Sequence, residues 1–167
     1  IEELTYVREA EDGIHLGPLC TLAMLRDDPT IQSRLPALAE ATGQIASPQI
    51  QNMATLGGNL LLDTRCVYYN QSYFWRQALG FCLKKDGDTC FVVEKGRKCV
   101  AAHSSDTAPV MLCLGAEVTL SSPRGDRQLL LKDLYKRPGD DHLRIQKDEI
   151  LSDIRVPLPP VGQRSGY

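Results

Sequence analysis

Residues 55–66 read TLGGNLLLDTRC and join two different kinds of sequence. The first half contains Gly57-Gly58, a pair that interrupts both helical and strand periodicity. The second half ends at Cys66, where aromatic, basic and cysteine residues become abundant. We therefore predict a host domain that is interrupted by an insertion beginning near Cys66.

The composition of the whole chain limits its partners. Its 167 residues include 19 Lys and Arg against 21 Asp and Glu, a formal net charge of −2. This length suits one globular domain. Nucleic acids and anionic membranes require clustered positive charge, so neither is an expected partner. The longest apolar stretch, 109–116, is far shorter than the roughly 18 residues of a membrane span, and we expect a soluble protein.

Hydrophobic patterns on both sides of the insertion predict strands and helices. Residues 4–9 and 14–17 flank the turn Glu11-Asp12-Gly13 and are typical of a hairpin. Helical patterns follow at 21–26, after Pro29, at 36–41 and at 107–114, the last with Asp106 as N-cap. Further strands are predicted at 117–121, 128–131 and 154–156. Together these predicted strands and helices indicate an α+β fold, with a mainly antiparallel sheet and helices on one side of it.

The motif Thr55-Leu56-Gly57-Gly58-Asn59 has two interpretations. Glycines lack a Cβ, so their backbone N–H groups can approach a phosphate, with Thr55 and Asn59 as additional donors. Alternatively, the motif is a tight turn between two elements, which physical reasoning alone favours. The spacings of a Walker loop and of a dinucleotide fingerprint are both absent.

The block 66–102 has a composition of its own. It holds seven of the ten aromatic residues, and its basic residues exceed its acidic ones by three. Four of the six cysteines lie there, namely Cys66, Cys82, Cys90 and Cys99. The other two, Cys20 and Cys113, stand in apolar helical contexts and are expected in the core.

The four clustered cysteines suit several chemistries. Thiolates are the preferred ligands of structural zinc and of iron–sulfur clusters, but the gaps of 15, 7 and 8 residues lack the usual two-residue spacing. The surplus of Lys and Arg would offset a negatively charged cluster, and aromatic rings would exclude water from it. A metal centre, disulfides and buried free thiols all remain open. His103 is a weaker candidate ligand, because a lone histidine more often has an ordinary role.

The ends of the chain give two expectations. No secretory signal is visible, so a reducing, cytoplasmic location is expected, and this disfavours disulfides. The start at Ile1 and the proline-rich stretch 157–160 lead us to expect that the sequence is cut from a longer chain.

Several motifs together resemble a known family. They are Leu16-Gly17-Pro18-Leu19, 35–41, Ile45-Ala46-Ser47-Pro48, 55–59, Ser105-Asp106, Leu114-Gly115-Ala116-Glu117 and Asp148-Glu149-Ile150-Leu151. In this order they are similar to the FAD-binding medium subunits of molybdenum hydroxylases, such as xanthine dehydrogenase and carbon monoxide dehydrogenase. The resemblance implies an FAD-binding subdomain of the PCMH-type flavoprotein fold at 1–62 and 103–160, an insertion at 63–102, and a linker to a further subdomain at 161–167.

The insertion has its own resemblance within this family. Its segments Asp63-Thr64-Arg65-Cys66, 69–72, Cys82-Leu83-Lys84, Gly87-Asp88, Cys90 and Cys99 are similar to the β subunit of 4-hydroxybenzoyl-CoA reductase. There the four cysteines hold a 4Fe-4S cluster. The resemblance therefore implies that Cys66, Cys82, Cys90 and Cys99 are cluster ligands.

The resemblance also implies flavin contacts. Thr55, Leu56, Gly57, Gly58 and Asn59 would bind the FAD pyrophosphate. Asp106 would bond near the ribityl chain, and Ile150 and Leu151 would lie near the isoalloxazine. The family's other glycine-rich FAD loop, which lies upstream, is not in this sequence. No residue is expected to catalyse proton transfer.

The implied function is electron transfer within a molybdenum enzyme. A ferredoxin-type donor would reduce the 4Fe-4S cluster and FAD, which would pass electrons through a 2Fe-2S small subunit to a large subunit carrying the molybdenum cofactor. The expected assembly is a dimer of heterotrimers that dehydroxylates 4-hydroxybenzoyl-CoA to benzoyl-CoA. Two alternatives remain: a molybdenum hydroxylase acting on aldehydes, N-heterocycles or CO, and a structural zinc-binding module.

Overall fold

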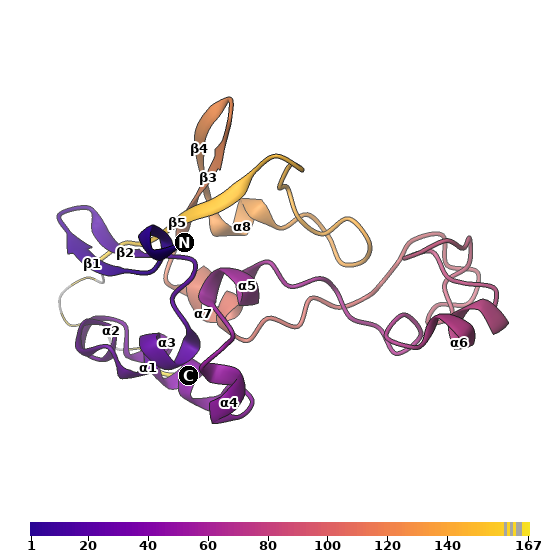
Figure 1. Cartoon of the computed structure of the whole chain (residues 1–167), viewed down its shortest axis with the longest axis horizontal. Coiled ribbons are helices and arrows are strands. Elements are labelled where there is room, and N and C mark those ends of the chain that lie inside the picture. The colour runs from indigo at the N-terminus through magenta and orange to yellow at the C-terminus, as the bar shows by residue number, and fades with distance from the viewer. Residues whose placement is uncertain (159, 161, 163–164) are drawn as a thin grey trace. The chain divides into compact units, whose positions relative to one another are not determined.

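The computed structural model describes residues 1–158, 160, 162 and 165–167, and the chain divides into two compact units (Figure 1). The host unit comprises residues 1–61, 105–134 and 145–167. The insert unit comprises residues 62–104 and 135–144, so it contains the expected insertion and a second segment as well. The expected linker 161–167 includes Val161, Gln163 and Arg164, which lie outside the described residues.

The host unit is built on a five-stranded sheet of order β1-β2-β5-β3-β4 in which every neighbouring pair is antiparallel. Its strands are β1 (Val7–Ala10), β2 (Gly13–Leu16), β3 (Glu117–Ser122), β4 (Gly125–Leu130) and β5 (Ile150–Val156). Gly13 begins β2 with φ of +149°, and a Cβ there would lie 2.5 Å from the carbonyl oxygen of Val156. The predicted hairpin and antiparallel sheet are confirmed, although β5 begins four residues before the predicted strand.

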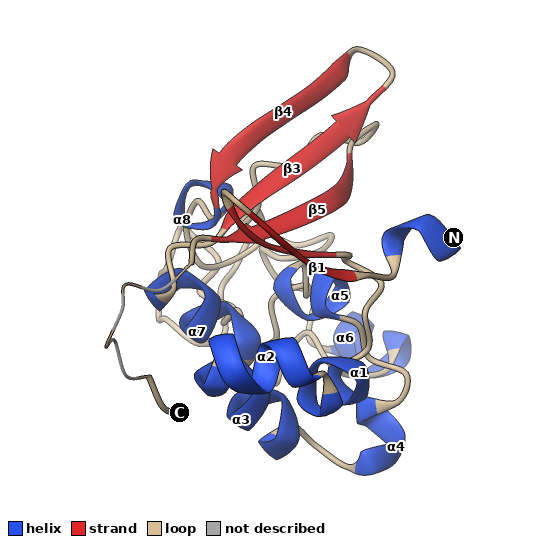
Figure 2. Cartoon of the chain, turned by 90° about the vertical axis from the view of Figure 1, so that its left-hand side faces the viewer, coloured by secondary structure: helices blue, strands red, loops and turns tan. Residues whose placement is uncertain are grey.

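Short helices cover one side of this sheet (Figure 2). They are α1 (Leu22–Asp27), α2 (Pro29–Arg34), α3 (Pro36–Gln44), α4 (Pro48–Gln51), α5 (Leu56–Leu60) and α7 (Thr107–Cys113); a 3₁₀ turn (Glu2–Leu4) precedes β1, and α8 (Leu131–Leu134) follows β4. Local sequence sets their starts, because proline opens α2, α3 and α4 and side-chain oxygens of Thr21 and Asp28 cap α1 and α2. The predicted arrangement of helices on one side is confirmed.

The core of the host unit joins the sheet to these helices. Fully buried side chains come from strands, such as Ile14 and Leu120, and from helices, such as Leu38 and Met111. Each such side chain contributes roughly 2 kcal/mol by leaving water. Cys20 is buried as predicted, but the prediction for Cys113 is wrong. It lies in the last turn of α7 with its side chain exposed.

The insert unit contains one helix, α6 (Tyr73–Ala78), within long loops. Arg65 and Ala102 form an antiparallel bridge, each donating its N–H to the carbonyl of the other at 2.7 and 2.9 Å. The segment 135–144 packs on this base: the Thr64 hydroxyl donates to the carbonyl of Gly139 at 2.6 Å. The insertion is therefore closed at its base by backbone pairing.

Among the described residues, no helix combines the length and apolar composition needed to cross a bilayer.

Candidate functional site

The four clustered cysteines line one cavity of the insert unit, of about 20 Å³. Cys90 and Cys99 are buried, whereas Cys66 and Cys82 are half-buried. The remaining lining is mainly apolar and aromatic: Tyr68, Tyr69, Leu83, Lys84, Phe91, Val92, Val100 and Ala101. The structure thus brings together four thiols that are dispersed over 34 positions of the sequence.

Turns position two of the cysteines, Cys66 and Cys82, at this cavity. The carbonyl of Cys66 accepts from the N–H groups of Tyr69 and Asn70 at 3.0 and 2.9 Å, which folds the chain back on itself. The carbonyl of Cys82 accepts from Lys85 and Gly87 in the same way, at 2.9 and 3.1 Å. Tight turns of this kind aim side chains that are distant in sequence at a shared centre.

Cys99 is held by its neighbours on two sides. Its sulfur accepts a hydrogen bond from the N–H of Ala101 at 3.5 Å, the type of contact that tunes iron–sulfur ligands. Gly139 packs against its backbone with φ of +109°, and a Cβ on Gly139 would lie 2.3 Å from the Cys99 carbonyl oxygen. Burial raises the pKa of the Cys99 thiol, while the nearby charge of Lys84 acts in the opposite direction.

Aromatic side chains cover the cysteine cavity. The Tyr68 ring packs against Phe91 and Trp75, with centroids 5.5 and 6.4 Å apart. The guanidinium of Arg76 lies over the rings of Tyr69 and Phe81. Aromatic covering of this kind excludes water and lowers the local dielectric constant, which strengthens the effect of any charge near the thiols.

The donor set fits a group that takes four thiolates. A single tetrahedral zinc, with Zn–S of about 2.3 Å, would draw four sulfurs to within about 3.8 Å of one another. In the described part of the chain, no three His, Cys, Asp or Glu side chains are arranged to hold a metal ion. The four sulfurs are therefore not drawn together around one ion, and the cysteines surround the small cavity described above. Its volume suits about one water molecule, so a 4Fe-4S core would need the surrounding loops to move outward.

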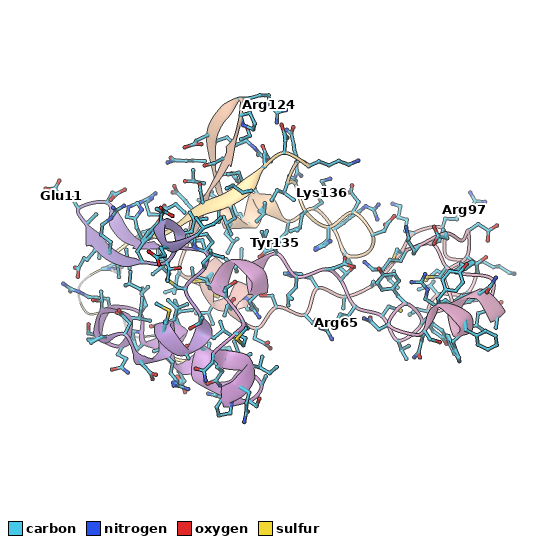
Figure 3. All side chains as sticks on the ribbon, viewed as in Figure 1. Glu11, Arg65, Arg97, Arg124, Tyr135 and Lys136 are labelled. Atoms are coloured by element: carbon cyan, nitrogen blue, oxygen red, sulfur yellow. The ribbon has the colours of Figure 1, made fainter. Side chains whose placement is uncertain are left out.

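His103 does not line the cysteine cavity. It lies in a second cavity of the insert unit, of about 560 Å³, together with Tyr135, Lys136 and His142. Tyr135 and Lys136 are labelled in Figure 3. The His103 ring packs against those of Tyr135 and His142, with centroids 5.0 and 5.4 Å apart. Burial raises the pKa of Tyr135, so its phenol stays neutral. The observed surroundings of His103 are aromatic packing, in line with the ordinary role favoured from the sequence.

The glycine motif of the host unit forms α5, although the glycine pair predicted a break. Its backbone N–H groups already have protein acceptors: Leu56 donates to the carbonyl of Cys20 and Gly57 to that of Pro18, both at 2.9 Å. The N–H of Gly58 donates to the Thr55 hydroxyl at 3.1 Å. The motif is therefore a helical turn anchored to the preceding loop.

The two glycines have different surroundings. Gly57 is buried, and a Cβ there would lie 2.7 Å from the Cβ of Pro18. Gly58 is exposed, and a Cβ there would meet only the Thr55 hydroxyl, at 3.0 Å. Gly57 is thus required for packing, whereas Gly58 leaves an open face beside a hydroxyl that could receive a phosphate.

Asn59 connects α5 to the start of α7. Its buried side-chain oxygen accepts from the Ser105 hydroxyl at 2.8 Å and from the N–H and hydroxyl of Thr107 at 3.0 and 2.6 Å. Ser105 in turn accepts from the N–H of Ala108 at 3.0 Å. Asp106 is the N-cap residue of α7, as predicted, but its exposed side chain makes no capping hydrogen bond, and Ser105 supplies that bond instead.

Ile150 and Leu151, the expected isoalloxazine neighbours, begin β5 and pair with Ser121 and Leu120 of β3. Ile150 is 56% exposed and available for contact, whereas Leu151 is buried in the core. The preceding residue, Glu149, receives two hydrogen bonds from Arg127, at 2.7 and 2.9 Å. This bidentate pair fixes the entry into β5.

Comparison with known proteins identifies the host unit's family. Residues 1–159 match the family described as the FAD binding domain in molybdopterin dehydrogenase. The chain is 29% identical to the nicotinate dehydrogenase FAD-subunit of Eubacterium barkeri over 168 residues, covering 100% of this chain and 44% of that protein. It is 27% identical to the carbon monoxide dehydrogenase medium chain of Afipia carboxidovorans, with the same coverage.

A solved structure agrees with this assignment. The crystal structure of the cyanide-inactivated form of Cu,Mo-CO dehydrogenase superposes with a TM-score of 0.66 at 28% identity, covering 96% of this chain and 42% of that one. The chain thus spans less than half the length of each of these three proteins. Since the family match covers nearly all of its residues, the chain belongs to the FAD-binding domains of molybdopterin dehydrogenases.

Proposed function

We propose that this chain is the electron-transfer part of a molybdenum enzyme, with FAD on the host unit and a 4Fe-4S cluster in the insert unit. The observation that carries the proposal is the single cavity lined by Cys66, Cys82, Cys90 and Cys99. Four thiols, a backbone N–H at one sulfur and an aromatic covering together suit an iron–sulfur cluster. When bound, the cluster supplies one-electron transfer and the flavin can exchange one or two electrons.

Specific side chains of the host unit would contact FAD. The hydroxyl of Thr55 and the open face of Gly58 are the parts of the glycine motif available to the pyrophosphate. Leu56 and Gly57 would shape that turn through their bonds to the loop before α1, and Asn59 would hold it against α7.

The remaining flavin contacts come from two other positions. The exposed carboxylate of Asp106 could accept hydrogen bonds from ribityl hydroxyls. Exposed Ile150 would lie near the isoalloxazine, with buried Leu151 supporting it from the core.

The whole enzyme would contain further chains. Similar proteins are named an FAD-subunit and a medium chain, which suits a partner subunit with the molybdenum cofactor and a small subunit with 2Fe-2S clusters. We propose a dimer of heterotrimers in the cytoplasm, reduced by a ferredoxin-type donor.

The proposed reaction is reductive dehydroxylation of 4-hydroxybenzoyl-CoA to benzoyl-CoA, on the strength of the insertion's resemblance. The alternative is oxidation of nicotinate or CO, the substrates that appear in the names of two similar proteins. Assaying the purified complex for both reactions, with a low-potential donor in one and an oxidising dye in the other, would separate them.

Elemental analysis tests the cofactor proposal directly. The complex should be purified without oxygen and analysed for flavin, iron, acid-labile sulfide and zinc. We expect one FAD in this chain and about four irons more than the 2Fe-2S subunit accounts for. Flavin with no additional iron would refute the cluster, and one zinc in its place would support the structural zinc module.

A further inference from the structure

Of the residues that the structure describes, Lys84 is the one cationic side chain that lines the cysteine cavity. Only 5% of its side chain is exposed. Its ammonium donates to the Asp63 carboxylate at 2.8 Å and to the Thr64 hydroxyl at 2.6 Å. It also lies 4.8 Å from the centroid of the Tyr69 ring, and Tyr69 lines the same cavity. Three contacts thus fix a buried positive charge at the wall of the cavity, and this charge acts on the Cys99 thiol.

The counter-ion does not cancel this charge at the cavity. The Asp63 side chain is 61% exposed, so water screens its negative charge strongly. Partial burial disfavours ionisation of Asp63, but the hydrogen bond and charge of Lys84 outweigh that effect and lower the pKa of the carboxyl. The Lys84 ammonium lies over the ring of Tyr69, a lining residue of the cavity, and its charge acts on the Cys99 thiol across this mainly apolar region, where screening by water is weaker.

The same lysine also braces the base of the insertion. Thr64, which accepts from Lys84, is itself 1% exposed and donates to the carbonyl of Gly139. Gly139 packs against Cys99, so the contacts run from Lys84 through Thr64 and Gly139 to a cysteine of the cavity. A side chain held in this way can set both the charge at the cavity and the position of the loop that carries Cys99.

We propose that Lys84 is a positioning residue of the cysteine site whose fixed positive charge raises the reduction potential of the group bound there. This inference rests on the proposed 4Fe-4S cluster. Reduction adds one electron to the cluster, supplied by a low-potential one-electron donor. A nearby cation stabilises the reduced, more negative state over the oxidised one, and therefore makes the cluster easier to reduce.

Neighbouring lysines provide a matched test. Lys84→Met removes the buried charge and keeps the length of the side chain, while Lys84→Arg keeps the charge. Lys85→Met removes the same charge from the adjacent position, where the side chain is 58% exposed and pairs with Asp86 at 3.7 Å. Each variant is purified as the complete complex, its iron is counted, and the cluster is titrated electrochemically with its reduced signal followed by electron paramagnetic resonance.

We expect the ratio of reduced to oxidised cluster at a fixed applied potential to fall roughly tenfold in Lys84→Met, and to stay near wild type in Lys84→Arg and Lys85→Met. Loss of iron from Lys84→Met, with full iron in Lys84→Arg, would also support the inference, because it would show that the cysteine site needs the positive charge at position 84. An unchanged potential in Lys84→Met, or equal shifts in both Met variants, would overturn the inference and leave the cluster standing. Loss of iron from both Lys84 variants would show a packing role and contradict it. A wild-type complex without the additional iron would overturn the proposed function as well.

Discussion

The side-chain oxygen of Asn59 accepts both the N–H and the hydroxyl of Thr107, at 3.0 and 2.6 Å. These residues lie 48 positions apart, on opposite sides of the insertion. The contact therefore joins the two segments of the host unit that the insertion separates in sequence, and it does so inside the core, where both residues are buried.

Asn59→Ala should destabilise the host unit strongly. It leaves the N–H and hydroxyl of Thr107 and the hydroxyl of Ser105 without their acceptor, at a cost of roughly 2–4 kcal/mol in the free energy of unfolding. Urea denaturation followed by circular dichroism measures this cost. Asn52→Ala, at an exposed position, is the matched control and should change stability by less than about 0.5 kcal/mol. Equal effects at both sites would contradict the proposed importance of the Asn59 contact.

The two neighbouring glycines should respond differently to alanine. Gly57→Ala places a Cβ against Pro18 and should cost about 1–3 kcal/mol of stability, in spite of the better helix propensity of alanine. Gly58→Ala should leave stability near wild type and weaken FAD retention, because the added methyl fills the face beside Thr55. Thermal unfolding and flavin content of the purified complex measure the two effects. Normal flavin content in a folded Gly58→Ala protein would argue against a phosphate contact there.

Gly139→Ala should disturb the cysteine cavity. At φ of +109° a Cβ would collide with the Cys99 carbonyl, so Cys99 must shift. We expect iron content to fall to less than half of the wild-type value. Gly80→Ala is a control in the same unit, since Gly80 also has a positive φ of +86° but open space around its Cα. If both variants lose iron equally, backbone strain and not contact with Cys99 is responsible.

Cysteine substitutions test the ligand set. Cys82→Ser should lose the cluster or degrade it, because a proposed thiolate ligand is removed. Cys20→Ser and Cys113→Ser should keep full iron, since both residues belong to the host unit. Iron and acid-labile sulfide per flavin are the measurements. Equal loss in all three variants would mean that the ligands are wrongly chosen.

The Arg127–Glu149 pair should make stability depend on acid pH. The hydrogen bonds from Arg127, and next that from the N–H of Gln146, lower the pKa of Glu149 from 4.5 to about 2. Above pH 4.5 the carboxylate is charged in both folded and unfolded chains, and its full stabilisation is present. Between pH 4.5 and about 2 the unfolded chain takes up a proton that the folded chain does not, so this stabilisation is lost.

Glu149→Gln removes that linkage and should flatten the acid limb of the stability profile. Urea unfolding at several pH values between 2 and 7, with Glu11→Gln as an exposed control, measures the difference. Parallel profiles for wild type and Glu149→Gln would refute the effect.

Much of the host fold could be predicted because its signals are local. Prolines at helix starts, the Asp12-Gly13 turn and alternating strands each act within a few residues, and the structure has the elements they indicate. The glycine pair misled the prediction of α5, because contacts of Gly57 with Pro18 decide that turn and periodicity carries no sign of them. The prediction that Cys113 is buried was wrong because an apolar stretch does not reveal which face of a helix is exposed.

The cysteines of the candidate site could be predicted from the sequence, but the residues that hold them in position could not. Cysteines are rare enough for a cluster of four to be noticed in a sequence. Gly139 lies 40 positions from Cys99 within Pro138-Gly139-Asp140-Asp141, which is typical of a solvated turn. Lys84 resembles its neighbour Lys85 in sequence, and only its burial and its contacts with residues distant in sequence distinguish it. Long-range packing of this kind leaves no local pattern.

The backbone bridge between Arg65 and Ala102 has a consequence for the length of the insertion. Antiparallel partners have Cα atoms only about 5 Å apart, so the chain leaves and rejoins the bridge at nearly the same point. A segment with adjacent ends can be gained or lost with little effect on the surrounding fold, and the entropy of closing it grows only slowly with its length. Changes in the length of the cysteine-bearing loop between these two residues should therefore leave the sheet and helices of the host unit in place.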